Sequence, residues 1–405
     1  MSEAIVILWL EGVAPDRLRA LPTARALAAR GATARLTPLP LVEVTNCSYQ
    51  TLTGLGSGKL GHFDAVRPFA YEAREDAETP EGAWRRLLPD LVRAGGRTAA
   101  QIDVPVADAL AALEDASSDC ALARLRGAGD ASDETLNAII EQCAGRAGAD
   151  GHILLLTDAW SPPPQRLVNI NNFLADVGLL EHATNGQSDE IVWPETLAYG
   201  LGAGQVWLNL RGREPEGAVE AGREADEVRA TLIDLLLHEW RDPATGEPVV
   251  AQALTKEEAY SGEHVFKAPD IVVVYRQGYA PSPHARALQL DEASVLPGDP
   301  PAATNGSDAH AISADFPAAR LIGCGPALAP GADATGRLID VVPSVLYLLG
   351  LPIPRHLDGQ ALTALFSTSY RERTPLVEAA DDATTLTEDD EDIIVGRLQA
   401  LGYLG

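Results

Sequence analysis

Two uninterrupted apolar runs give the first indication of the fold. Residues 4–10 and 153–156 carry only apolar side chains, which is typical of a strand covered on both faces of a parallel sheet. Each run is followed within two residues by a carboxylate, Glu11 or Asp158. Because functional groups of an open α/β sheet gather at the carboxyl ends of its strands, we expect both carboxylates at one edge of a central sheet.

Helical patterns lie between the predicted strands. Residues 15–30 indicate a helix interrupted at Leu21-Pro22 and ended by Gly31, since proline breaks a helix and glycine commonly follows one. Residues 132–147 indicate a second helix opened by Ser132, although Thr135 stands where a full capping box has Glu or Gln. Other segments are predicted as strands (97–103, 205–210 and 318–324) or helices (80–94, 224–240, 339–349 and 387–404).

The order of these elements predicts a single α/β domain over residues 1–375. Within it, residues 196–310 form a distinct, smaller inserted unit, and 276–310 are rich enough in Pro, Ala, Asp and Gly to indicate a long loop. Residues 376–405 are predicted to be an acidic segment followed by a terminal helix. We find no internal repeat.

Charge and cysteine usage narrow the class of protein. The formal net charge is −27 at pH 7, so phosphate groups of a nucleic acid duplex would be repelled. No stretch approaches the roughly 20 apolar residues that span a bilayer, and no membrane association is expected. The four cysteines form no C-x-x-C pair, and the first residues lack a basic segment and a cleavage site. We therefore expect a cytoplasmic protein with reduced thiols.

Two segments resemble those of a known family. Glu11-Gly12 with Pro15-Asp16 is similar to the Asp-Gly-x-x-Pro-Asp of the alkaline phosphatase superfamily, and Thr45 through Gly54 resembles its nucleophile loop. The pattern is most similar to the type I phosphodiesterase / nucleotide pyrophosphatase group. Weaker matches follow in the same order along the chain, at 58–64, 155–160, 168–174, 178–180, 209–217, 242–248, 268–270, 340–343, 348–352 and 357–359.

The resemblance implies a fold and a chemistry. The implied fold is an alkaline-phosphatase-like three-layer α/β/α sandwich with a largely parallel central sheet and a smaller inserted subdomain. Members of the family hold two divalent ions, usually zinc, which activate a Thr or Ser nucleophile. Carried over by position, Thr45 is the nucleophile, Asn46 and Lys59 contact the substrate, and Glu11 and Asp158 bind metal.

The implied metal site is incomplete. Ala159 stands where the family has a metal-binding His, and Trp160 would fill the space left beside it. The late ligand of the second ion falls at Asp308 or, with a small insertion, at His310 when the register is taken from Gly306. It falls at Asp315 or Phe316 when the register is taken from Gly325-Pro326. The set that is left has mainly oxygen ligands, which suit Mg²⁺ or Mn²⁺ better than Zn²⁺. We therefore expect one divalent ion, or none.

Alternatives stay open for several of these residues. Thr45 is either a nucleophile or a turn residue, and His310 is either a site residue or a loop histidine. Glu11 is either a metal ligand or a structural carboxylate paired with an arginine. Lys59 is either a phosphate contact or a solvated loop lysine.

The sequence accordingly leaves two functions. The first is a phosphoester or phosphodiester hydrolase with a small phosphorylated substrate. The second is a catalytically inactive pseudoenzyme that keeps the fold to bind a ligand, a protein partner or a second copy of itself.

Overall fold

The computed structural model describes residues 4–38, 51, 53–60, 63, 66–69, 71–75, 87–114, 118–158, 164–184, 189–298 and 319–379. Four predicted site residues, Thr45, Asn46, Asp308 and His310, lie outside these ranges, as does the predicted helix at 387–404. No helix among the described residues is both long and apolar enough to cross a membrane.

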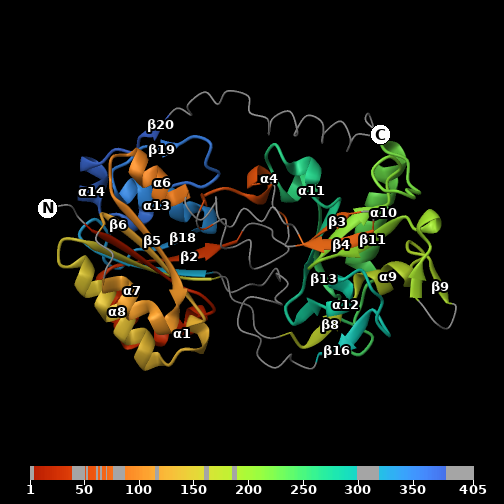
Figure 1. The fold of residues 1–405 in the computed structure, drawn as a ribbon, viewed down its shortest axis with the longest axis horizontal. Coiled ribbons are helices and arrows are strands. Elements are labelled where there is room, and N and C mark those ends of the chain that lie inside the picture. The colour runs from red at the N-terminus through yellow and green to blue at the C-terminus, as the bar shows by residue number, and fades with distance from the viewer. Residues whose placement is uncertain are drawn as a thin grey trace.

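A seven-stranded sheet forms the centre of the first lobe (Figure 1). Its strands are, in spatial order, β18 (Asp333–Arg337), β2 (Ala32–Thr37), β17 (Ala319–Cys324), β7 (His152–Thr157), β1 (Ile5–Leu10), β6 (Cys120–Arg126) and β5 (Ala99–Pro105). In this sheet β17 runs antiparallel to both neighbours, and the other pairings are parallel. The predicted α/β class with a largely parallel central sheet is confirmed.

Helices cover both faces of this sheet and make the three layers (Figure 1). One face carries α1 (Pro15–Ala20), α2 (Pro22–Arg30), α7 (Ala109–Glu114) and α8 (Asp133–Ala147), and the other carries α6 (Leu87–Ala94), α13 (Val341–Leu348) and α14 (Thr368–Arg373). The break between α1 and α2 falls at Leu21, just before Pro22, as predicted. The Ser132 hydroxyl caps α8 by accepting a bond from the Thr135 amide.

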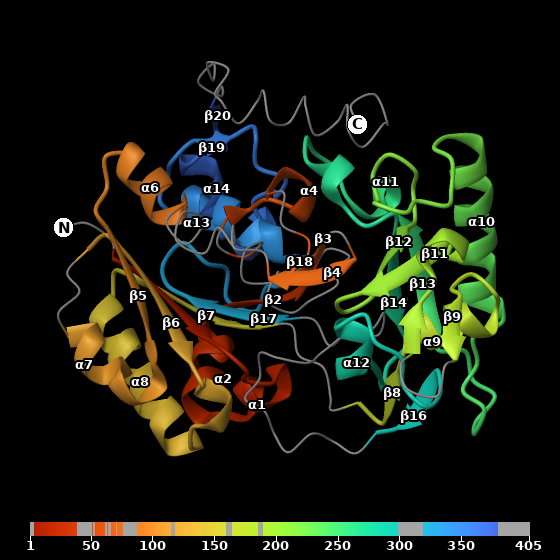
Figure 2. The same cartoon turned by 45° about the vertical axis from the view of Figure 1, so that its right-hand side comes forward.

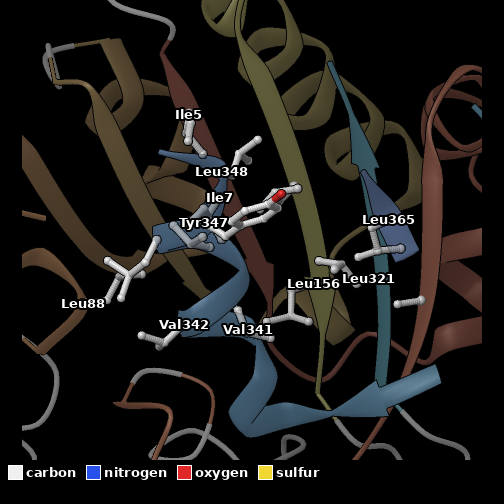
Figure 3. Packing of buried hydrophobic residues seen from close by; sticks show 14 of the residues in the cluster. Ile5, Ile7, Leu88, Leu156, Leu321, Val341, Val342, Tyr347, Leu348 and Leu365 are labelled. Atoms are coloured by element: carbon white, nitrogen blue, oxygen red, sulfur yellow. The ribbon is translucent and has the colours of Figure 1, made fainter. Parts of the chain in front are cut away.

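Alternating side chains of the strands divide the first lobe into two apolar cores. Odd-numbered positions of β1, such as Ile5 and Ile7, pack with α13, whereas Val6 and Leu8 pack with α1, α2 and α8. Figure 3 shows the first core, in which Tyr347 and Leu348 of α13 lie against the strands. Every residue of α13 is buried, so this helix lies wholly in the interior of the protein.

The second lobe has its own sheet and its own core (Figure 2). Its four strands are ordered β11 (Ala198–Leu201), β12 (Gln205–Leu208), β14 (Ile271–Tyr275) and β13 (Val250–Thr255), all antiparallel. The helices α9 (Ile170–Asp176) and α10 (Arg223–His238) contribute to the same core. The helix α9 precedes residue 196, where the predicted inserted unit begins. The second lobe therefore also contains residues from before that unit.

A second, small sheet in this lobe replaces part of the predicted loop at 276–310. Strands β15 (Tyr279–Pro281) and β16 (Val295–Pro297) flank β8 (Arg166–Val168), and α12 (Pro283–Arg286) lies between β15 and β16. The loop prediction is therefore wrong for residues 279–281, 283–286 and 295–297. The prolines of this segment suggested a loop, but Pro281 and Pro297 lie at the ends of short edge strands. At such positions the missing N–H of proline removes no hydrogen bond between strands.

The two lobes touch backbone to backbone between α4 (Ser57–Leu60) and the loop after α11 (Lys256–Ala259) (Figure 2). The His264 amide donates to the Gly58 carbonyl at 2.9 Å. A Cβ on Gly58 would lie 2.3 Å from the Ser261 oxygen, and one on Gly262 would lie 2.6 Å from the Gly58 carbonyl. Only glycine allows this approach, and Gly262 also has a φ of +131°.

Candidate functional site

The register of the parallel strands brings the two predicted carboxylates together. Leu10 is paired with Thr157 across β1 and β7, so the residues that follow, Glu11 and Asp158, emerge side by side at the carboxyl edge. One rung earlier, Trp9 is paired with Arg124. The site is thus a product of register, as expected for an open α/β sheet.

Asp158 is a buried carboxylate whose two oxygens both accept hydrogen bonds from the protein. The indole Nε1–H of Trp9 donates to Oδ1, and the Gly12 amide donates to Oδ2 at 2.9 Å. Gly12 can aim its N–H in this direction because it adopts a left-handed φ of 75° in the turn after β1. Only 8 % of Asp158 is exposed.

Burial raises the pKa of Asp158 to about 6. The negative charge of Glu11 also raises it, whereas the bonds from Gly12 and Trp9 and the positive charge of Arg124 lower it. Desolvation therefore outweighs the donors. One lone pair of each oxygen is directed at a protein donor.

Glu11 is held by an arginine of the neighbouring strand. Nε and Nη2 of Arg124 both lie 2.7 Å from Oε2 of Glu11. The guanidinium stands over the Trp9 ring, 5.2 Å from its centroid, which is a favourable cation–π position. The structure shows Glu11 paired with an arginine, and its role as a metal ligand stays a prediction.

A third carboxylate at this edge was not recognised in the sequence. Asp103 of β5 is paired with Arg124 in register. Its carboxylate lies 3.9 Å from Nη1 of Arg124 and 3.1 Å from Nε of Arg126. The available signal was the polar pair Arg124 and Arg126 at alternate positions of an otherwise apolar strand, which places both side chains on one face.

These residues do not fit a divalent ion as they stand. Each oxygen of Asp158 already accepts a hydrogen bond from Trp9 or Gly12, and the charge of Glu11 is balanced by Arg124. Within the part of the chain that the structure describes, no group of three His, Cys, Asp or Glu is arranged to hold a metal. The predicted ligands Asp308 and His310 fall outside that part, so their roles stay predictions.

Lys59 is engaged within the first lobe. Its ammonium lies 2.7 Å from Oδ1 of Asp358 and donates to the carbonyl of His356 at 2.7 Å. Asp358 in turn accepts from the Gly56 amide at 2.9 Å. The lysine therefore ties α4 to the segment after β19 (Ile353–Pro354), and its contact with a substrate stays a prediction.

A cavity of about 270 Å³ opens between the lobes beside Lys59. Charged residues on its wall are Glu257, Glu258, Arg337 and Asp358. With three carboxylates against one guanidinium, this wall does not favour an anion.

Several family-like positions of the second lobe have structural roles. Asp270 is buried and paired with Arg213 at 2.7 Å. Burial opposes its ionised form, yet the pKa of Asp270 is lowered, because the charges of Arg213 and Lys256 outweigh desolvation. Asn209 donates from Nδ2 to the carbonyls of Trp193, Thr196 and Glu216. These residues hold backbone segments of the second lobe in position.

Comparison with known proteins gives the class of fold. No protein-family model matches this chain, and no curated protein matches it. Solved structures of nucleotide pyrophosphatase/phosphodiesterases do match over nearly the whole chain. The fold is that of these phosphodiesterases, an alkaline-phosphatase-like α/β sandwich, and at the observed sequence identities the likeness shows the fold alone.

The particular structures are those of one protein from two mammals. Murine ectonucleotide pyrophosphatase/phosphodiesterase 5 matches with a TM-score of 0.51 and 13 % identity, over 90 % of this chain and 100 % of the other. The human protein matches with 0.53 and 13 %, over 92 % and 99 %. An inactive variant of the murine protein in complex with AMP matches with 0.52 and 12 %, over 92 % and 99 %.

Proposed function

We propose that this protein is a non-catalytic relative of the phosphodiesterases that uses their fold to bind a small phosphorylated ligand. The observation that carries the proposal is the state of Asp158, whose two carboxylate oxygens accept from Trp9 and Gly12. Both oxygens of this carboxylate are already engaged by donors of the protein, and an ion would have to compete with these donors for its charge. Phosphoryl transfer assisted by a metal needs carboxylates that are bound to the ion.

The choice of ligand class rests on the comparison. The inactive murine variant was solved in complex with AMP, so a protein of this fold can hold a nucleotide without turnover. AMP is therefore the first probe to use. The acidic cavity between the lobes is not where we place its phosphate, because Glu257, Glu258 and Asp358 line that cavity.

The second candidate is a hydrolase, and it is favoured by the residues from Thr45 through Gly54, which resemble a nucleophile loop. In this candidate the Thr45 hydroxyl attacks phosphorus. Glu11 and Asp158 would bind Mg²⁺ or Mn²⁺ in competition with Arg124, Trp9 and Gly12.

One set of assays separates the two candidates. Wild type and Thr45→Ala are incubated with bis(p-nitrophenyl) phosphate and Mg²⁺, Mn²⁺ or Zn²⁺, and thermal unfolding is recorded with and without AMP. We expect no hydrolysis by either protein and a rise in Tm with AMP. Metal-dependent hydrolysis that disappears in Thr45→Ala would overturn the proposal in favour of the hydrolase. No hydrolysis and no AMP effect would overturn the ligand class and direct attention to a protein partner.

A further inference from the structure

We infer that the guanidinium of Arg124 is the resident cation of this site and takes the place that a divalent ion would have among the strand-end carboxylates. The carboxylates concerned are Glu11, Asp103 and Asp158, and we call this group the Arg124 cage. The inference does not rest on the absence of hydrolysis, since it concerns only what neutralises these carboxylates in the native protein.

The geometry places Arg124 between elements that cannot easily separate. Trp9, Arg124 and Asp103 share one rung of three adjacent parallel strands. Glu11 begins the turn after β1, and its backbone is fixed because the Gly129 amide donates to its carbonyl at 3.0 Å. The guanidinium is therefore held on three sides by groups that the sheet positions.

Burial makes the cation necessary. The side chains of Arg124, Glu11 and Asp103 are 18 %, 17 % and 20 % exposed. Half-buried carboxylates gathered this closely repel each other and lose hydration, so they need a counter-charge. Within the described part of the chain, Arg124 is the cation bonded to Glu11, while Arg126, with its side chain 53 % exposed, meets Asp103 from the solvent side.

The flat shape of the cation explains the indole beneath it. Trp9 presents its ring face to Arg124 and its Nε1–H to Asp158. A guanidinium can stack on the ring and bond to carboxylates in its own plane, whereas a divalent ion requires several oxygens around a point. One indole thus satisfies the cation and the most buried anion together, and this arrangement suits arginine, not a metal ion.

The test compares thermal unfolding of wild type, Arg124→Met, Arg124→Lys and Arg93→Met, each in chelator and in millimolar Mn²⁺. Arg93 is the control, because its side chain forms an exposed ion pair with Asp90 and donates to the carbonyl of Ala99, four residues before Asp103 on β5. For wild type, and likewise for Arg93→Met, we expect the Tm in chelator to equal the Tm in Mn²⁺. Arg124→Met should unfold about 5 °C or more lower in chelator. Mn²⁺ should recover part of that loss, and Glu11→Gln combined with Arg124→Met should abolish the recovery.

Each other outcome has a defined meaning. If Mn²⁺ stabilises wild type and Glu11→Gln removes the effect, a metal ion binds there natively and the inference is wrong. If Arg124→Met unfolds like wild type, or gains nothing from Mn²⁺, the guanidinium is not a replacement for an ion. If Arg124→Met does not fold, a folded Arg124→Lys supports the need for a cation at this position, and a Lys variant that also fails to fold contradicts it. None of these readings depends on phosphodiesterase activity, so failure here is distinct from failure of the proposed function.

Discussion

At the scale of single residues, the properties of the site depend on which groups accept hydrogen bonds and which groups donate them. The sequence predicted that Glu11 and Asp158 would meet, since strand ends converge in a parallel sheet, and the register confirms it. It could not choose between a metal and an arginine for Glu11. That choice depends on Arg124, which belongs to a strand that the apolar pattern did not single out. Long-range pairing of this kind has no local signal.

The indole of Trp9 gives the first prediction. Trp9→Phe keeps an aromatic ring at this position, but it removes the indole Nε1–H that donates to Asp158. Losing a donor to a buried carboxylate should lower the free energy of unfolding by about 2 kcal/mol at pH 8. The measurement is denaturant unfolding.

Trp240→Phe is the control for Trp9→Phe. Trp240 is also buried, and its Nε1 has no hydrogen-bond partner among the described residues. Its replacement therefore reports the loss of indole packing alone. Equal losses of stability in the two variants would mean that the bond to Asp158 contributes nothing.

The carboxyl of Asp158 gives a prediction about pH. Its pKa is raised from 3.8 to about 6 in the folded state, so the folded protein binds more protons than the unfolded chain between these values. Stability from this group is therefore present below about pH 4 and is lost as the pH rises through about 6. Relative to Asp158→Asn, wild type should lose about 2–3 kcal/mol between pH 4 and pH 7.

The difference between the two unfolding free energies isolates Asp158, because the other carboxyl groups are common to both proteins. It is obtained from urea unfolding at several pH values. A difference that stays constant, or that moves in favour of wild type as the pH rises, would contradict the raised pKa.

At the scale of elements, sequence patterns were most reliable where one force dominates. The apolar runs became β1 and β7, and the interruption before Pro22 became the boundary between α1 and α2. The loop prediction missed the short strands between residues 279 and 297, because no single local force determines them. These strands are three residues long and are stabilised by pairing with β8, which lies more than a hundred residues earlier. Composition within the segment does not record that pairing.

The contact between α4 and the loop after α11 gives a prediction at this scale. Gly58→Ala places a Cβ 2.3 Å from the Ser261 oxygen, so the two backbones must move apart. We expect a loss of about 1–3 kcal/mol in the free energy of unfolding. The measurement is urea unfolding followed by fluorescence.

Gly145→Ala is the matched control, because Gly145 lies in α8 and a Cβ there meets no atom within 4 Å. Alanine in a helix should stabilise by about 0.5–1 kcal/mol. The two Gly-to-Ala changes should therefore differ in sign. A Gly58→Ala protein as stable as wild type would show that the lobes do not approach this closely.

At the scale of the whole molecule, the likeness to known proteins lies in the fold. The chain matches the mammalian phosphodiesterase structures over at least 90 % of its length at 12–13 % identity. In this chain, polar contacts such as Arg213 with Asp270 are structural. The reduced metal site expected from Ala159 and Trp160 stays a prediction, because both residues lie outside the part of the chain that the structure describes. The protein donors that bond to the strand-end carboxylates could be identified only from the sheet.

The most direct test of this account is the metal content of wild type, measured by elemental mass spectrometry after separate soaks in Zn²⁺, Mn²⁺ and Mg²⁺ and removal of loose ions. Glu11→Ala and Asp158→Ala are measured beside it. With Arg124 on Glu11 and two protein donors on Asp158, we predict no stoichiometric ion that depends on either residue. About one tightly held ion per wild-type chain, lost in both variants, would contradict the account and establish a metal site at the strand ends.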